Sequence, residues 1–554
     1  MKSFTIFPTL GRRSDVSPDG NQCFVFPNPD NPGLAYTYDV GGINYSVQRE
    51  RGSISKSLGK AKWSSNGLDG ICNGMFELYD GDLYRERFVG KGETTGYMLV
   101  YTEALHQRIA LTTPASLGGG EALSFIRVGK YAVFTDQATT TPYKWKHGDS
   151  TTASKLITAP TEYKFRYLAK FQRRVFGLYS DQTDGNIEIR WGTAWPDTVI
   201  TSMTFPAANQ MYIPNDDTIT GGATMGINRL FIYCEDSTQL ITYYPDYDAP
   251  FRIYTVAPQQ GFATHNSIIN LGNRHYGFNK NYGFCEYRGG DTFTPISAKI
   301  EPDIADIDPA HYSKIVGTHL PVERTLAWTV PLKGSADNSH ILFYHLDSKQ
   351  WSIDDKVTSC IDTWYTSSYL DWGDLALTWN GDVYNSAKWN EAPDGETWQA
   401  YSGVRNRLIM AGDHKRTSAS AGFESAHIYV STSEDLLGTG AGKSISPIDA
   451  YRVEPIMSFG NPRRFDLLTE VWFSITKKHK STIDVYHRCG DTAGEVKAQD
   501  WTSVGSISCD SPDRPVVHVE KNARLHQIKW GTNAVTETFR VNRITFKYEE
   551  GSNG

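Results

Sequence analysis

The sequence predicts an all-β protein, in which a β-propeller-like ring of blades is followed by a C-terminal β-sandwich domain. Three observations lead to this fold class. The 554 residues include 14 Trp, 31 Tyr and 25 Phe, together 13% of the chain, and aromatic residues suit pleated, half-buried strands. The chain also contains 49 Gly and 25 Pro, which punctuate turns. Finally, one strand–turn–strand pattern recurs along the sequence, so we expect little helix.

The repeated unit is a short strand, a polar turn and a second strand rich in aromatic residues. Clear copies occupy residues 125–134, 167–178, 224–233 and 268–278, and looser copies occupy 322–328 with 341–344, and 375–384. The spacing between copies is 42 to 57 residues when it is measured between the markers Ile126, Leu168, Met225, Ile269, Val322 and Leu375. This spacing is typical of a four-stranded propeller blade.

Six or seven such units fit between about residue 60 and residue 400. A closed ring is favoured because one blade cannot cover its own apolar faces, whereas neighbouring blades can. The competing fold is a string of β-sandwiches, and the repeat is short for that fold because one sandwich domain takes about 100 residues.

The sequence divides into four segments. Residues 1–60 form an N-terminal extended arm that provides a closing strand or packs along the ring, with strand candidates such as residues 22–26. Residues 61–400 form the propeller, and residues 401–450, which overlap the polar stretch 390–442, form a polar loop or insertion. Because that stretch is long and rich in small residues between ordered strands, we expect it to contact other chains. The C-terminal β-sandwich covers 451–554, with strands at 468–475, 482–486, 515–519, 525–530 and 543–548.

Charge and hydrophobicity exclude two classes of protein. Lys and Arg number 55 against 62 Asp and Glu, which gives a net charge of −7 and excludes a nucleic-acid binder of the usual basic kind. No run of 18 apolar residues is present that could cross a bilayer. The N-terminus has no apolar signal segment, so we expect the chain to be made and kept in a cytoplasm.

The cysteines agree with a reducing compartment. They are odd in number, scattered and without a CxxC pair, which indicates buried thiols rather than a disulfide framework or a zinc site. The seven are Cys23, Cys72, Cys234, Cys285, Cys360, Cys489 and Cys509.

Two short stretches match known functional motifs only in part. Residues 437–444 resemble a phosphate-binding loop, but Leu437 stands where the pattern needs glycine and Pro447 interrupts the helix that should follow. Residues 251–254, Phe-Arg-Ile-Tyr, differ by one residue from the Phe-Arg-Ile-Pro motif of sialidases. The sialidase Asp boxes are missing, and the nearest approach is 490–494 before Trp501. We interpret these stretches as a flexible loop and an ordinary strand.

Two clusters of acidic residues are candidate sites. Asp303, Asp306 and Asp308 lie close together, as do Asp246 and Asp248. Paired carboxylates could serve glycoside hydrolysis only if they faced each other across a bond, and neither cluster has the spacing of a calcium loop. We therefore interpret both clusters as solvated turns or caps.

Histidine spacing gives no metal site either. His340 and His345 are five residues apart in a strand, which puts them on opposite faces. The sequence thus predicts no catalytic residue, no metal ligand and no cofactor.

Longer stretches resemble the nozzle, or tail-stabilisation, proteins of short-tailed bacteriophages. The resemblance lies in residues 261–269 and 275–290, and continues through 294–297, 328–331 and 345–353. Residues 189–197, Trp472 and residues 543–548 fit the same order, so that the likeness covers roughly residues 20–550. It consists of turn and aromatic positions, without a short active-site motif from which residue roles could be transferred.

The resemblance implies a structural virion protein that forms the distal tail tube. It implies a homo-oligomeric ring, commonly sixfold, that adjoins tail adaptor or portal-proximal proteins and tail fibre or spike proteins, and through which the phage DNA passes during ejection. The expected location is the virion tail after synthesis in the bacterial cytoplasm, without membrane insertion. Two alternatives stay open: a propeller enzyme acting on glycans, such as a sialidase-like hydrolase, and a carbohydrate-binding adhesin.

Overall fold

The fold is known from a computed structural model, and the prediction of an all-β protein is confirmed. Antiparallel sheets dominate the structure. The described residues are 1–18, 21–25, 34–47, 54–57, 59–62, 71–79, 85–92, 97–102, 108–111, 122–136, 141–146, 149, 153–157, 162–194, 203–244, 250–335, 337–367, 404–411, 428–432, 449–459, 463–475, 482–509, 515–533 and 539–551.

Seven four-stranded antiparallel sheets, here called sheets 1 to 7, make up one part of the described structure. In each of sheets 1 to 6 the strands pair in chain order. Sheet 1 consists of β7 (Ile71–Tyr79), β8 (Arg85–Gly92), β9 (Tyr97–Thr102) and β10 (Arg108–Leu111). Sheet 2 consists of β11 (Ser124–Val128), β12 (Tyr131–Thr135), β13 (Tyr143–Trp145) and β14 (Ser154–Lys155). Sheet 3 consists of β15 (Phe165–Phe171), β16 (Arg174–Ser180), β17 (Glu188–Trp191) and β18 (Gln210–Tyr212). Sheet 4 consists of β19 (Ile219–Met225), β20 (Arg229–Cys234), β21 (Ser237–Tyr243) and β22 (Phe251–Pro258). Sheet 5 consists of β23 (Ile269–Asn270), β24 (His275–Asn279), β25 (Gly283–Tyr287) and β26 (Thr294–Pro295). Sheet 6 consists of β27 (Val316–Leu320), β28 (Thr325–Val330), β29 (His340–His345) and β30 (Gln350–Asp354).

Sheet 7 is completed by a strand from the start of the chain. It comprises β31 (Cys360–Ser367), β32 (Val404–Ala411), β33 (Ile428–Thr432) and β6 (Gly59–Lys62). Strand β6 pairs antiparallel with β33, with Tyr429 opposite Lys62 and Thr432 opposite Gly59. Residues far apart in the sequence therefore share one sheet.

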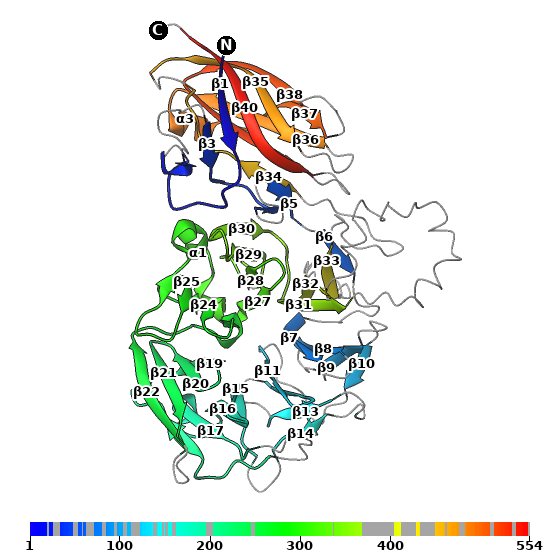
Figure 1. Cartoon of the computed structure of the whole chain (residues 1–554), viewed down its shortest axis with the longest axis vertical. Helices are drawn as coiled ribbons and strands as arrows, with labels where there is room; N and C mark the ends of the chain where they lie inside the picture. The colour runs from blue at the N-terminus through cyan, green and yellow to red at the C-terminus, as the bar shows by residue number, and fades with distance from the viewer. Residues whose placement is uncertain are drawn as a thin grey trace, which may run out of the picture.

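The seven sheets lie around a common centre (Figure 1). The first strands of successive sheets contact one another from β7 through β11, β15, β19, β23 and β27 to β31, and β31 in turn contacts β7. Sheets 1 and 7 also share a hydrophobic cluster that includes Cys72, Val89, Cys360 and Ile409. The series of contacts thus closes on itself.

Aromatic side chains fill the space between neighbouring sheets. Phe284 of sheet 5 and Trp328 of sheet 6 have ring centroids 4.5 Å apart, and the Trp328 indole N–H donates to the carbonyl of Ser267 at 3.0 Å. Between sheets 4 and 5, the Tyr233 hydroxyl lies 2.5 Å from Nδ1 of His275. Large rings suit such sites because they bury much apolar area and their polar atoms find partners.

Two further sheets form a second unit that lies beside the ring in Figure 1. The larger sheet has the order β2-β3-β1-β40-β35-β38, with β5 pairing with both β40 and β4, and the smaller has the order β34-β39-β36-β37. Their strands are β1 (Lys2–Phe7), β2 (Phe24–Val25), β3 (Leu34–Thr37), β4 (Tyr45–Ser46), β5 (Ile54–Lys56), β34 (Ala450–Val453), β35 (Asp466–Ile475), β36 (Thr482–Gly490), β37 (Thr502–Ser508), β38 (Val516–Ala523), β39 (Leu525–Thr532) and β40 (Arg540–Glu550).

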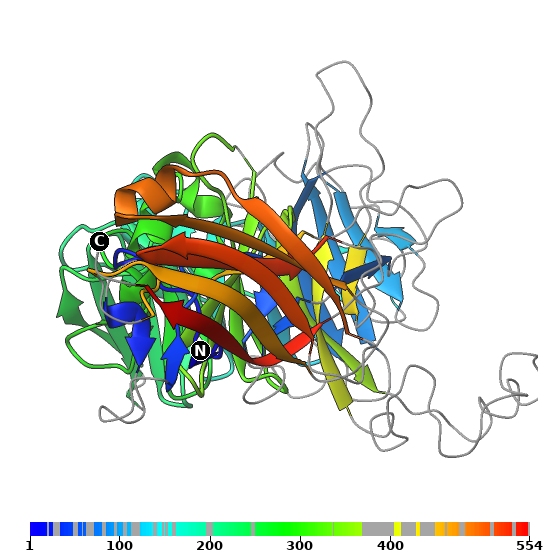
Figure 2. The same cartoon turned by 90° about the horizontal axis from the view of Figure 1, so that it is seen from above.

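Both sheets of this unit contribute to one hydrophobic core. Val471 and Phe546 from the larger sheet and Val485 and Trp530 from the smaller one are buried in the same cluster, together with Ile6. Strand β1 lies inside the larger sheet, antiparallel to β40 and parallel to β3, and the long curved strands of the unit are seen from above in Figure 2. The first residues of the chain are therefore part of the C-terminal unit.

Helix is scarce among the described residues, as the sequence predicts. The helical elements are short: α1 (Glu301–Ala305), α3 (Ala493–Ala498), and the 3₁₀ turns η1 (Asn21–Cys23), η2 (Gly185–Ile187), η3 (His265–Ser267), η4 (Ala298–Ile300) and η5 (Pro309–Lys314).

One prediction is wrong for part of its range. Residues 401–450 were expected to be a polar loop or insertion, yet β32 and β33 lie within them. The physical reason is a short apolar run, since Leu408, Ile409 and Met410 are buried in the ring between two polar stretches that hide it in the average composition. Residues 401–403, 412–427 and 433–448 lie outside the described residues, and the expected contact of this stretch with other chains stays a prediction.

A buried histidine pair makes the C-terminal unit sensitive to acid. Nε2 of His487 lies 3.0 Å from Nδ1 of His526, and Nε2 of His526 faces the carbonyls of Asp466 and Ala523. Burial lowers the pKa of His526 to about 4, and burial together with the nearby His526 lowers the pKa of His487 to about 3. Both rings are therefore neutral at pH 7.

We expect the stability of this unit to fall as the pH drops below the unfolded histidine pKa of about 6.5. The folded pKa values are depressed, so each histidine contributes stability above that pH and loses roughly 1.4 kcal/mol per pH unit toward pH 4. Urea unfolding at pH 7 and pH 5 measures this slope. The variant H487Q/H526Q should flatten it, whereas H518Q, at the exposed His518, should leave it unchanged; an equal slope in all three proteins would contradict the assignment.

Candidate functional site

The junction between the ring and the C-terminal unit is formed by the N-terminal segment. The Gly11 N–H donates to Oε1 of Gln350 at 3.2 Å, and the N–H groups of Arg12 and Asn44 donate to the carbonyls of Trp351 and Ile353 at 2.7 and 2.9 Å. A Cβ on Gly11 would lie 2.4 Å from the Trp351 oxygen. Only glycine therefore permits this close approach to β30.

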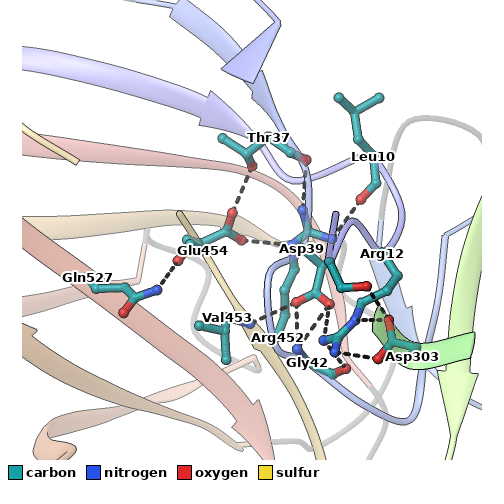
Figure 3. Close-up of polar contacts among 11 residues, drawn as sticks. Leu10, Arg12, Thr37, Asp39, Gly42, Asp303, Arg452, Val453, Glu454 and Gln527 are labelled. Atoms are coloured by element: carbon teal, nitrogen blue, oxygen red, sulfur yellow. Dashed lines mark hydrogen bonds and ion pairs between the residues drawn. The ribbon is translucent and has the colours of Figure 1, made fainter. Parts of the chain in front are cut away.

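Arg12 ties this segment to the ring and to the C-terminal unit through two carboxylates (Figure 3). Its guanidinium donates to Asp303 of α1 through Nη2 at 3.0 Å and Nε at 3.3 Å, and Nη1 lies 3.4 Å from Asp39. Asp39 is fully buried and also accepts from the N–H groups of Gly42 and Val453. Burial opposes the charged form of Arg12, yet Asp39 and Asp303 raise its pKa.

Arg452 forms the second half of this network. The fully buried side chain donates through Nε to Glu454 at 2.8 Å, through Nη1 to the Leu10 carbonyl at 2.9 Å and through Nη2 to the Thr37 carbonyl at 2.8 Å. Glu454 in turn accepts from the Thr37 hydroxyl at 2.7 Å and from the Trp530 indole at 3.0 Å, while its own carbonyl accepts from Gln527 (Figure 3). Although burial opposes its charge, Glu454 and Asp39 raise the pKa of Arg452.

This arrangement of charges and hydrogen bonds fixes the position of the N-terminal segment. A buried ion pair is stable only when hydrogen bonds satisfy its remaining donors and acceptors, and here backbone groups and side chains from five separate stretches of chain do so. The groups hold the N-terminal segment against β34 and α1, and their hydrogen-bonding capacity is occupied by the protein itself.

A cavity of about 390 Å³ opens beside this junction, between sheets 6 and 7. Asp354 in its wall is held by Lys356 and by Ser57, each at 2.6 Å, and Arg324 pairs with Asp347 at 2.8 Å. His345 contacts the hydroxyls of Thr325 and Ser352, and burial lowers the His345 pKa to about 4. Two ion pairs, Asp354 with Lys356 and Arg324 with Asp347, therefore lie in the wall of this cavity.

A smaller cavity of about 200 Å³ lies at the centre of the ring. Residues of the first strands line it, among them Phe125, Ala223, Val316 and Cys360. Polar and apolar atoms contribute about equally to its lining, which includes the imidazole of His265 and the carboxyl group of Asp362.

The acidic cluster predicted from the sequence is split by the structure. Asp308 caps η5 by accepting from the Ala310 N–H and lies 2.8 Å from Nδ1 of His311, which confirms its interpretation as a cap. Asp306 is exposed at the end of α1. Asp303 instead joins the network of Arg12, a role that the sequence does not indicate. Asp246 and Asp248 lie outside the described residues.

The other candidate residues take structural positions. His340 and His345 lie on opposite faces of β29, and each contacts neighbouring hydroxyls. Residues 251–254 begin β22, and residues 490–494 lead into α3, which Thr492 and Glu495 close with a capping box. Residues 437–444 lie outside the described residues.

Sequence reasoning missed Arg12, Asp39, Arg452 and Glu454. The hydrogen bonds that join these two pairs, from Thr37 to Glu454 and from the Val453 N–H to Asp39, span more than four hundred positions, which no spacing rule can find. The one local signal is in the stretch Tyr-Arg-Val-Glu at 451–454, where two charged residues alternate with apolar ones in a strand.

No family model matches the chain, and no curated protein matches it significantly. Within the ranges given above, no three His, Cys, Asp or Glu side chains gather as metal ligands, and no helix has the length and apolar character needed to cross a membrane. Six of the seven cysteines are buried thiols, as predicted, and Cys489 is half-buried.

Proposed function

We propose that sheets 1 to 7 are the blades of a seven-bladed β-propeller and that the two remaining sheets form a β-sandwich. The closed series of first-strand contacts supports the propeller. A further support is β6, which completes the last sheet with a strand from the start of the chain, because such a strand holds the two ends of a ring together. A single core shared by two sheets is what a sandwich requires.

We propose further that the protein is a structural virion protein, a subunit of the distal tail tube, or nozzle, of a short-tailed phage. The observation that carries this proposal is the junction network, in which the buried charged side chains connect the N-terminal segment, the ring and the C-terminal unit. A rigid two-part subunit suits an assembly that must withstand pressure. The resemblance of residues 261–290 to nozzle proteins points the same way.

The genome channel of this assembly would lie between copies of the chain. The cavity at the centre of one ring measures about 200 Å³, a cube of roughly 6 Å on each edge, while the major groove of DNA alone is about 12 Å wide. A duplex cannot pass through it. Several copies arranged around an axis are therefore needed to enclose DNA.

The adhesin alternative is favoured by one observation. Tyr243, Tyr244 and Tyr254 are 43, 38 and 42% exposed, and the hydroxyls of Tyr244 and Tyr254 are 3.5 Å apart. Exposed aromatic faces can stack on sugars, so a glycan array probed with the full chain examines this alternative directly.

Mass in solution and glycan turnover together test the proposed function. We expect the purified full chain to form a defined assembly near six times 62.0 kDa and to leave sialosides and bacterial polysaccharides intact. A monomer that cleaves either class of glycan would contradict the proposal and favour the enzyme.

A further inference from the structure

The topology of the ring separates its turns into two faces. In sheets 2 to 6 the turns between the first and second strands lie at one end of the strands, and the described turns between the second and third strands lie at the other, because successive strands are antiparallel. Neighbouring first turns are in contact: Nε2 of Gln172 donates to the Ile227 carbonyl at 2.9 Å, and the Gly226 N–H donates to the Gly272 carbonyl at 2.7 Å. On the opposite side, Lys280 pairs with Asp236 across the second turns of sheets 5 and 4.

The first-turn side carries a repeated positive charge. In five successive sheets, a basic residue begins the second strand or directly precedes it: Lys130, Arg174, Arg229, Arg274 and Arg324. Equivalent positions in successive sheets lie side by side on the ring, so these charges form an arc. Two of these residues, Arg274 and Arg324, form ion pairs with Glu286 and Asp347.

The first turns of sheets 3 and 4 are basic, and the described residues at the opposite end of these two sheets are acidic. Their first turns, residues 170–174 and 225–229, contain Lys170, Arg173, Arg174 and Arg229 and no acid. At the opposite end, exposed carboxylates follow the second strands or connect the two sheets: Asp181, Asp184, Asp216, Glu235 and Asp236. Lys164 and Lys280 offset part of that charge. We call these two surfaces, defined by the residues named here, the basic face and the acidic face.

Exposed aromatic side chains adjoin the basic face. Arg252 at the start of β22 lies over the Tyr244 ring at 4.6 Å, and Tyr243 and Tyr254 are also exposed. Tyrosine and arginine are the residue types that most often dominate the binding energy of protein interfaces. The turn at 245–249, which carries Asp246 and Asp248, lies outside the described residues.

We propose that the basic face of one copy binds the acidic face of the next copy of this chain. The proposal rests on the ring assembly put forward above, because a closed ring of more than two identical subunits needs two different surfaces on each copy. Two surfaces of opposite charge on the same two sheets meet this requirement. Complementary charge also fixes the order of the subunits, since like faces repel.

Charge reversal on each face, alone and combined, tests the pairing. We expect R174E/R229E and E235K/D236K each to raise the dissociation constant of the assembly at least tenfold in sedimentation at 0.15 M salt. The fourfold variant carries both reversals and should regain the unaltered value within about threefold, because opposite charges face each other again. K521E/R543E, which reverses two exposed charges of the C-terminal unit, is the matched control and should assemble normally.

The results of this experiment distinguish a failure of the pairing from a failure of the proposed function. An unaltered chain that stays monomeric at every concentration overturns the ring, and the pairing with it. An unaltered chain that assembles, with double variants that assemble equally well or a fourfold variant that stays dissociated, overturns the pairing alone. Normal assembly of R174E/R229E with loss of binding to a 30-base-pair DNA duplex assigns the basic face to nucleic acid and also overturns it. Unfolding midpoints equal to that of the unaltered chain show that each variant is folded.

Discussion

Replacement of Arg452 by methionine is expected to lower the free energy of unfolding by about 3–5 kcal/mol, because it leaves a buried carboxylate without its cation. Arg452 is fully buried, and Glu454 lies 2.8 Å from it. The variant also loses the two hydrogen bonds to the carbonyls of Leu10 and Thr37, so the N-terminal segment should become accessible to protease. Urea unfolding and limited proteolysis measure the two effects.

The matched control is an ion pair of the same kind in solvent. Lys155 and Glu162 are each 41% exposed, and K155M should cost less than about 1 kcal/mol, as exposed pairs do. The double variant R452M/E454M should be more stable than R452M, since it removes the uncompensated carboxylate. Equal stability of R452M and K155M would show that the junction does not depend on this charge.

Replacement of Trp351 by alanine is expected to cost about 3–5 kcal/mol through the cavity it leaves. Trp351 is fully buried, its ring centroid lies 4.9 Å from that of Tyr344, and its indole N–H donates to the Ile296 carbonyl at 2.9 Å. Because the backbone of Trp351 also accepts from Arg12, the loss should extend to the junction. Thermal unfolding monitored by fluorescence checks this result.

Trp501 provides the control for tryptophan removal. It is half-buried and stacks with Arg488, whose guanidinium carbon lies 4.3 Å from its ring centroid. W501A should cost no more than about 1 kcal/mol. A loss in W351A as small as that in W501A would contradict the assigned role of Trp351 in the core of sheet 6.

Local pattern was sufficient to predict the hairpins of the ring. The stretch 125–134 has a short, mostly apolar run on each side of Gly129 and Lys130, and the Gly129 φ of +61° suits a tight turn that glycine adopts without strain. Strands β11 and β12 flank that turn as expected. In the C-terminal unit, β35, β36 and β38 to β40 also match predicted strands.

Long-range pairing could not be predicted in the same way. Strand β6 pairs with β33 across more than 360 residues, and β1 pairs with β40 across the length of the chain. Periodicity states which face of a strand is buried, but not which partner covers it. The strands within 401–450 were missed because a three-residue apolar run is too short to stand out in a polar stretch.

The candidate site was less predictable than the fold. Arg12 and Asp39 lie in a segment rich in turns, where charged residues are normally solvated, and only the folded chain brings Arg452 close to Asp39. The acidic cluster could be recognised as a group, yet the separate roles of Asp303 and Asp308 depend on what packs against each. The basic and acidic faces could not be predicted either, because the net charge of −7 does not show where the charged residues lie on the surface.

Projection averages of the purified full chain test the central claim, that this protein is the subunit of an architectural ring. We predict annular particles of about six copies, with an opening between the copies wide enough for a DNA duplex. Single seven-sheet discs with one attached lobe, present alone at every protein concentration, would contradict the account.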